Sequence, residues 1–365
     1  MKKKNVVRLL IENGADVNKE NNYGSTPLLE ACKNGIENIV RLLIENGADV
    51  NKENKDGNTP LLESCKNGQD NIVRLLIENG ADVNKKNNDG DTPLIYACYR
   101  NYRNYENIVR LLIENGADVN QENKDGNTPL IETYMKNNES IIRSLIENGA
   151  DVNKINKDGN TILIKACRKG NENMVKLLIE NGADVSKENK YGNTPLIEVC
   201  NNNNENMVRL LIEYGADVNE ENKYGNTPLI YACRKNNENI VKLLIEKGAD
   251  INKENIDGNT SLIKACEKNN QNIVKLLIEN GAEVNKEDKK GNTPLIVACI
   301  KNNGKIVRML IENGADVNKK NKNGITPLTE ACKKENANIK KLLIDNGAYI
   351  NKDIQLWYSF NLNIT

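Results

Sequence analysis

Nine cysteines are the side chains of this sequence with the most chemistry open to them, because thiolates attack electrophiles, form disulfides and bind metals. Each stands five residues after a proline, or after its replacement, in a recurring segment. Equivalent helices of neighbouring segments would lie roughly 8–10 Å apart, whereas a disulfide needs Cα atoms within about 7 Å. We therefore predict free, buried thiols in a reducing compartment, the alternative being a redox or metal-binding ladder. They are Cys32, Cys65, Cys98, Cys167, Cys200, Cys233, Cys266, Cys299 and Cys332.

Other catalytic groups are missing from the sequence. It has no histidine for general acid–base catalysis, no glycine-rich phosphate loop after a strand and no Cys-x-x-Cys pair. Its glutamates include Glu45, Glu78 and Glu114, which recur beside a glycine and indicate a solvated helix face. We therefore predict a protein that is not an enzyme and that binds no cofactor, metal or small-molecule substrate.

A repeat positions these side chains. The glycine that follows Leu-Ile-Glu-Asn, or a close variant of it, recurs from Gly14 to Gly347 in steps of 33 residues, with a single step of 36 between Gly80 and Gly116. A fixed period of this size indicates a stacked array whose core is shared between neighbouring units. In each unit we expect threonine to cap a first helix, proline to begin it, and the glycine to end a second helix.

A unit of this length, with Thr-Pro-Leu opening one helix and Gly-Ala-Asp closing another, resembles the ankyrin repeat. The resemblance implies an all-α solenoid of stacked helix-turn-helix units with short β-turn or hairpin loops. The expected array covers 1–353, and 354–365 is expected to be a capping or disordered tail, or a docking peptide. Because the array begins in mid-repeat, 1–20 is either a minimal cap or the sign of a longer protein. The expected full repeats are 21–53, 54–86, 87–122, 123–155, 156–188, 189–221, 222–254, 255–287, 288–320 and 321–353.

The sequence departs from the family pattern in two places. The family usually has histidine after Thr-Pro-Leu, where it ties the loop to the next unit, whereas this chain has Leu or Ile, and Thr329 in the last unit. We interpret this change as an exchange of hydrogen bonds for apolar burial. In 123–155, Tyr134 replaces the cysteine and Ser144 a larger apolar residue, and the two changes are expected to compensate in one core.

The resemblance implies a scaffold or adaptor that binds a partner protein through its concave inner face, formed by the turn tips and the exposed side of the first helices. The alternative is a regulatory or spacer segment of a longer protein whose activity lies elsewhere. The net charge is zero and the pI is about 6.6, which argues against a nucleic-acid partner. No apolar run is long enough to span a bilayer, and Arg8 and Glu12 interrupt any secretory signal. We expect a monomer in the cytoplasm or nucleus.

Charge is distributed unevenly along the expected inner face. Six positions per unit were compared: the two before the turn glycine, the one after it, the third after the proline, and the two after the cysteine. Their charges sum to −1 over the first four full units and +11 over the last six. This favours a partner with an acidic or phosphorylated segment, although lysines that only keep the array soluble would give the same pattern. The predicted partner-binding residues are Tyr96, Tyr99, Arg100, Tyr102, Arg103, Lys157, Lys165, Arg168, Lys169, Lys190, Tyr191, Lys223, Tyr224, Tyr231, Arg234, Lys235, Lys264, Lys268, Lys289, Lys290, Lys301, Lys322, Lys333 and Lys334.

Overall fold

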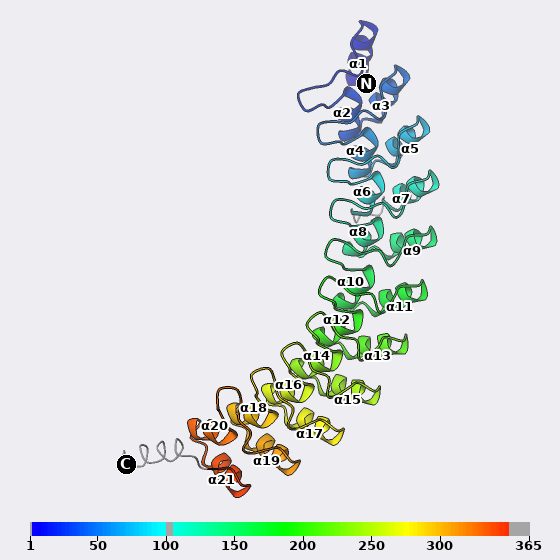
Figure 1. Cartoon of the computed structure of the whole chain (residues 1–365). Coiled ribbons are helices and arrows are strands. Elements are labelled where there is room, and N and C mark those ends of the chain that lie inside the picture. The colour runs from blue at the N-terminus through cyan, green and yellow to red at the C-terminus, as the bar shows by residue number, and fades with distance from the viewer. Residues whose placement is uncertain (1, 100–104, 350–365) are drawn as a thin grey trace. The chain divides into compact units, whose positions relative to one another are not determined.

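The computed structural model describes residues 2–99 and 105–349, and every regular element in this part of the chain is an α-helix (Figure 1). The predicted all-α solenoid is confirmed, and from residue 21 on one pair of helices falls within each expected repeat. The helices are α1 (Lys2–Glu12), α2 (Pro27–Lys33), α3 (Glu37–Glu45), α4 (Pro60–Lys66), α5 (Asp70–Glu78), α6 (Pro93–Tyr99), α7 (Tyr105–Glu114), α8 (Pro129–Met135), α9 (Glu139–Glu147), α10 (Ile162–Lys169), α11 (Glu172–Glu180), α12 (Pro195–Asn202), α13 (Glu205–Glu213), α14 (Pro228–Lys235), α15 (Glu238–Glu246), α16 (Ser261–Lys268), α17 (Gln271–Glu279), α18 (Pro294–Ile300), α19 (Gly304–Glu312), α20 (Pro327–Lys333) and α21 (Ala337–Asp345).

The first helix of a repeat begins where the sequence predicts. In α4, the hydroxyl of Thr59 accepts a hydrogen bond from the amide of Leu62 at 3.2 Å, and Pro60 occupies the first helical position. This arrangement satisfies one amide at the helix start and places proline where no amide is needed. An asparagine caps many of the second helices, as Asn237 does by accepting from the amide of Ile240 at 2.9 Å.

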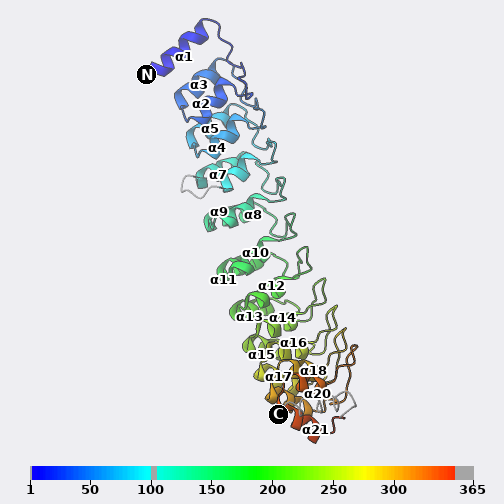
Figure 2. The same ribbon diagram turned by 90° about the vertical axis from the view of Figure 1, so that its left-hand side faces the viewer.

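The turn before each first helix projects away from both helices, as the second view shows (Figure 2). In the turn at 54–58, the amide of Gly57 donates to the carbonyl of Asn54 at 2.9 Å, and the side chain of Asn54 accepts from two amides. Gly57 has φ of +77°, and a Cβ there would lie 2.8 Å from the backbone nitrogen of Asn88 in the next turn. Glycine is therefore required both by its conformation and by the close approach of the neighbouring repeat.

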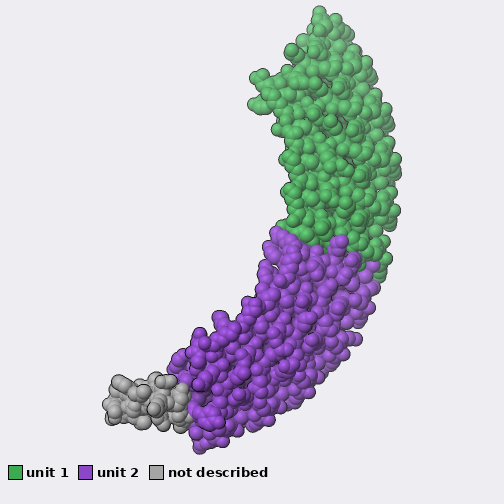
Figure 3. Space-filling model, viewed as in Figure 1, with its two compact units in different colours: residues 1–163, 180–183 green, residues 164–179, 184–365 purple. Residues whose placement is uncertain are grey.

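The chain forms two compact units, which Figure 3 draws in green and purple. The first comprises 1–163 with 180–183, and the second comprises 164–179 with 184–365. The first helices α2, α4, α6 and α8 pack on one another in the first unit, as α12, α14, α16, α18 and α20 do in the second, and each of these packs on the second helix of its own repeat. Leu, Ile, Val, Ala and Cys fill the resulting core. Leu62 and Ile263, at the position where the family has histidine, are completely buried, so the expected apolar burial is confirmed.

Amide side chains also join neighbouring repeats, which the sequence reasoning missed. At the turns, the Nδ2 atom of Asn222 donates to Oδ1 of Asn193 at 2.7 Å, and Asn255 repeats this bond with Asn226 at 2.8 Å. After the second helices, the side chain of Asn51 donates to the carbonyl of Gly80 at 3.0 Å and accepts from the backbone amide of Asp82. We call these two series the asparagine ladders.

Candidate partner-binding face

The turn tips and the exposed side of the first helices form what we call the first-helix face. In the second compact unit, α12, α14, α16, α18 and α20 pack one after another. Their turns are joined through the backbone: the amide of Lys223 donates to the carbonyl of Tyr191 at 3.1 Å, and that of Lys322 donates to Lys290 at 2.9 Å. Predicted residues from repeats 33 positions apart are thus brought side by side.

Seven predicted lysines on this face are exposed and form no ion pair within the described part of the second unit. Some lie at or just beyond the ends of the first helices, where a cation interacts favourably with the helix dipole. Others lie at the turn tips, where the helix dipole offers no such reason for a cation. The seven are Lys235, Lys268, Lys289, Lys290, Lys301, Lys322 and Lys334.

Other predicted cations are already engaged within the chain. The ammonium of Lys264 lies 2.9 Å from Glu267, and that of Lys333 lies 2.8 Å from Glu330. The side chain of Lys223 donates to the carbonyl of Lys190 at 2.7 Å. These groups are less available to a partner than the seven exposed lysines.

Arg168 is held by a buried carboxylate. Its Nε and Nη2 atoms donate to the two oxygens of Glu198 at 3.0 and 2.8 Å, and the Glu198 side chain is only 6% exposed. Asn189 and Asn193 each donate to the same carboxylate at 2.9 Å. Burial alone would raise the pKa of Glu198, but the hydrogen bonds from Arg168 and the two amides outweigh burial and lower it. This cluster is a structural support, and sequence reasoning did not find it because its partners lie 30 positions apart.

The predicted tyrosines of the second unit take different roles. Tyr191 and Tyr224 are about half exposed at the turn tips. Tyr231 is buried: its hydroxyl accepts from Asn222 at 3.1 Å, and the guanidinium of Arg234 lies 4.6 Å from its ring centre. Tyr191 and Tyr224 can therefore contact a partner directly, whereas Tyr231 positions Arg234 through a cation–π contact.

In the first unit, two of the predicted residues line a hollow of about 250 Å³ that is acidic. Tyr96 and Tyr99 line it together with Asp91, Asp125 and Glu132. Burial raises the pKa of Asp91 and that of Tyr96. Lys157 is exposed at a turn of this unit. Arg100, Tyr102 and Arg103 lie outside the described residues.

Comparison with known families decides what kind of array this is. A model described as "Ankyrin repeats (3 copies)" matches residues 1–54, 50–123, 102–189, 184–255 and 251–321, and one described as "Ankyrin repeat" matches 323–354. The chain belongs to the ankyrin-repeat family. Ankyrin repeats are generally protein–protein interaction modules. A search of curated proteins found no match.

In this ankyrin-repeat chain all nine cysteines are free and buried, as predicted. Burial raises the pKa of the Cys32 and Cys98 thiols to about 12, and it also raises those of Cys65 and Cys200. Within 2–99 and 105–349 no cluster of His, Cys, Asp or Glu could hold a metal ion. None of the described helices has the length and apolar character needed to cross a membrane.

These thiols are expected to be inert while the ankyrin array is folded, because the reactive thiolate is suppressed by burial. At about pH 8, a thiol-reactive dye should label the folded protein slowly and modify all nine cysteines once denaturant is added. Mass spectrometry of the labelled chain gives the count. Rapid labelling without denaturant, or disulfides recovered after blocking, would contradict the buried-thiol interpretation.

Proposed function

We propose that this chain is a non-catalytic scaffold or adaptor that binds another protein through its first-helix face. The observation that carries the proposal is the set of seven exposed lysines without ion pairs in the second unit. Buried core positions cannot account for them, because the repeats of both units share one core pattern. Interaction through repeats is also the general role of the family.

The partner that fits this face presents carboxylates or phosphates. Charge complementarity over an exposed face acts mainly on the association rate and on specificity. In this proposal the partner lies over the later first helices and touches the turn tips, including Tyr191 and Tyr224. The protein acts as a monomer in the reducing environment of the cytoplasm or nucleus, without a small-molecule substrate.

Reversal of charge on this face should slow association severalfold. The variant Lys235→Glu, Lys268→Glu, Lys290→Glu and Lys301→Glu is compared with wild type by surface-bound kinetics, after affinity capture and mass spectrometry have identified the partner. The association rate of wild type should fall with salt, because the Debye length falls from about 10 Å at 0.1 M to about 3 Å at 1 M salt. That of the variant should depend on salt less, because the attractive lysine charges have been removed.

A matched control carries four reversals on or directly after second helices instead: Lys176→Glu, Arg209→Glu, Lys242→Glu and Lys247→Glu. It should leave the association rate close to that of wild type. Thermal unfolding by circular dichroism should be nearly the same for wild type and the first-helix variant. If association ignores both salt and the first-helix reversals, the lysines serve only to solvate the array and the proposed face is wrong.

A further inference from the structure

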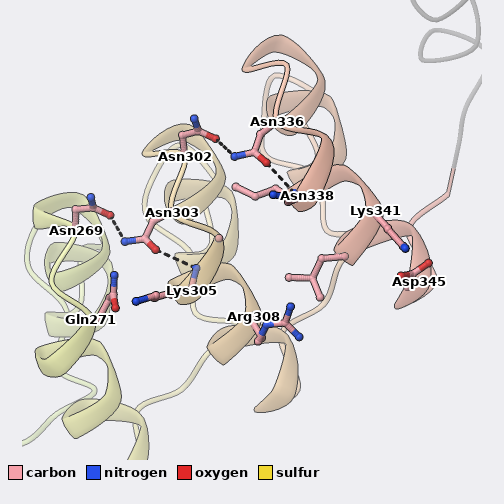
Figure 4. Close-up of a pocket in the computed structure, with 13 residues that line it drawn as sticks. Asn269, Gln271, Asn302, Asn303, Lys305, Arg308, Asn336, Asn338, Lys341 and Asp345 are labelled. Atoms are coloured by element: carbon pink, nitrogen blue, oxygen red, sulfur yellow. Dashed lines mark hydrogen bonds between the residues drawn. The ribbon is translucent and has the colours of Figure 1, made fainter.

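A second charged surface lies on the second helices of the last three repeats. Between α17, α19 and α21 the structure has a hollow of about 760 Å³. Figure 4 shows Gln271 from α17, Lys305 and Arg308 from α19, and Asn338 and Lys341 from α21 along it. We call this hollow the second-helix groove. None of the residues assigned to the first-helix face lines it.

The sequence of the second helices changes at this groove. At the start of the second helix, the seven earlier full repeats have an acidic residue, whereas the last three have Gln271, Gly304 and Ala337. A cation four residues later is kept throughout, as Lys275, Arg308 and Lys341 in these last repeats. The earlier acidic residues are Glu37, Asp70, Glu106, Glu139, Glu172, Glu205 and Glu238.

Within the described residues, the acidic residue forms an ion pair with this cation in three of the earlier repeats. Glu37 lies 3.3 Å from Arg41, and Glu205 lies 3.0 Å from Arg209. It also accepts from the next repeat, as Glu238 does from Asn272 at 3.1 Å. The last three repeats lack this carboxylate, and with it the ion pair and the bond between repeats that it makes in some of the earlier ones.

The loss leaves the groove positively charged. Lys305, Arg308 and Lys341 are exposed and make no ion pair with any described residue, and Asp345 is the single carboxylate among the lining residues. In the adjoining hollow Lys275 still has a partner, since its ammonium lies 3.7 Å from Glu279. Three cations beside one lining carboxylate repel one another, which raises the free energy of the unbound surface, and an anionic ligand relieves this repulsion.

We propose that the second-helix groove binds an acidic peptide segment of a partner protein. The cations pair with its carboxylates. The side chains of Gln271 and Asn338 offer both a donor and an acceptor, which matches the backbone groups of an extended peptide. None of the described residues that line the groove is aromatic and could stack on a nucleic-acid base, so the chemistry favours peptide over single-stranded nucleic acid.

The test restores the acidic residues that the rest of the array has. In the variant Gln271→Glu, Gly304→Glu and Ala337→Glu, each substitution introduces a residue found at the same place in earlier repeats. A Cβ on Gly304 would lie 3.7 Å from Ile339, which is ordinary contact, and first-turn glutamates support a helix. The thermal midpoint should therefore not fall, while the groove becomes acidic.

Binding is measured at low salt by fluorescence anisotropy of a short labelled peptide of alternating glutamate and glycine. The affinity of the restored variant for this peptide should be lower than that of wild type by about tenfold or more. The first-helix variant, in which Lys235, Lys268, Lys290 and Lys301 are reversed to glutamate, is compared with wild type in the same titration. If the groove is the site, the first-helix reversals change the affinity of this peptide by much less than the restored variant does.

The outcomes separate the groove from the first-helix face. Equal affinity of wild type and the restored variant would overturn the groove, whatever the first-helix variant does. Equal binding of a peptide with glutamine in place of glutamate would overturn the charge argument. Preferential binding of a single-stranded oligonucleotide of the same charge would replace the proposed partner class. Partner association through the first-helix lysines is measured separately, so either proposal can fail alone.

Discussion

Replacement of Tyr134 by alanine is expected to lower the free energy of local opening of α8 and α9 by about 3–5 kcal/mol. Tyr134 is 1% exposed and is the largest fully buried side chain in the described structure. It occupies the place that cysteine takes in the other full repeats, so its ring fills volume that no neighbouring side chain can supply. Native-state hydrogen exchange of peptides from these helices measures the loss.

A companion variant asks whether Tyr134 and Ser144 compensate each other. Tyr134→Cys restores the common residue of the array and should still leave a cavity. Addition of Ser144→Leu should recover part of the stability, with a coupling of about 0.5–3 kcal/mol if the two side chains share one core. Tyr214→Ala, at an exposed position, is the control and should change stability by about 0.5 kcal/mol or less. Strict additivity of the two changes would show that they do not compensate.

Replacement of Arg168 by alanine is expected to have the second largest effect, a loss of about 2–4 kcal/mol near neutral pH. Loss of one member of a buried ion pair leaves the other charge without its partner, which typically costs about 3–5 kcal/mol. The lower range applies because the Arg168 side chain is 37% exposed and solvent screens part of the interaction. Glu198, in contrast, is buried and cannot regain its hydration.

The difference in stability between wild type and the Arg168→Ala variant should be smaller in acid than at neutral pH. The pKa of Glu198 is lowered in the folded chain, so its contribution is fully present above the unfolded value of about 4.3 and is lost as the pH falls through the folded value. In the Arg168→Ala variant the hydrogen bonds from Arg168 are lost while burial remains, so the pKa of Glu198 should be higher than in wild type, and its protonation in acid should remove the cost of burying an unpaired charge. Exchange of α12 at pH 7 and pH 4 measures both states.

Two variants provide controls for the pH effect. Arg168→Ala combined with Glu198→Gln removes the buried charge and should recover stability at pH 7 relative to Arg168→Ala alone. Arg143→Ala removes a pair with Glu139 in which both side chains are more than half exposed, so it should have little effect. A loss from Arg168→Ala that is the same at both pH values would contradict the proposed role of the buried charge.

The fold could be predicted almost completely because its determinants are local and repeated. Threonine before Pro60, glycine at the end of each second helix and the apolar series of each helix are all read within one repeat. Tyr134 could be identified as unusual because nine other repeats show what stands in its place. Repetition within the chain thus provides the comparison that a single sequence ordinarily lacks.

The candidate site was harder to predict from the sequence than the fold, because it depends on contacts between repeats. Arg168 was predicted to face a partner, but its side chain bends to Glu198 in the next repeat. Tyr231 was predicted to lie on the surface, but a hydrogen bond from Asn222 accompanies its burial. Charge and residue type indicate that a face is basic, yet they do not tell which of its cations already have partners.

The asparagine ladders have a consequence for how the array responds to acidity. Primary amides neither gain nor lose protons in water near neutral pH, and the ladder bonds described above join amides to one another or to backbone groups. An imidazole at the equivalent link would change its charge between about pH 5 and 8. This chain has no histidine, so the cohesion between its repeats stays constant over the range in which imidazole-linked arrays respond to protons.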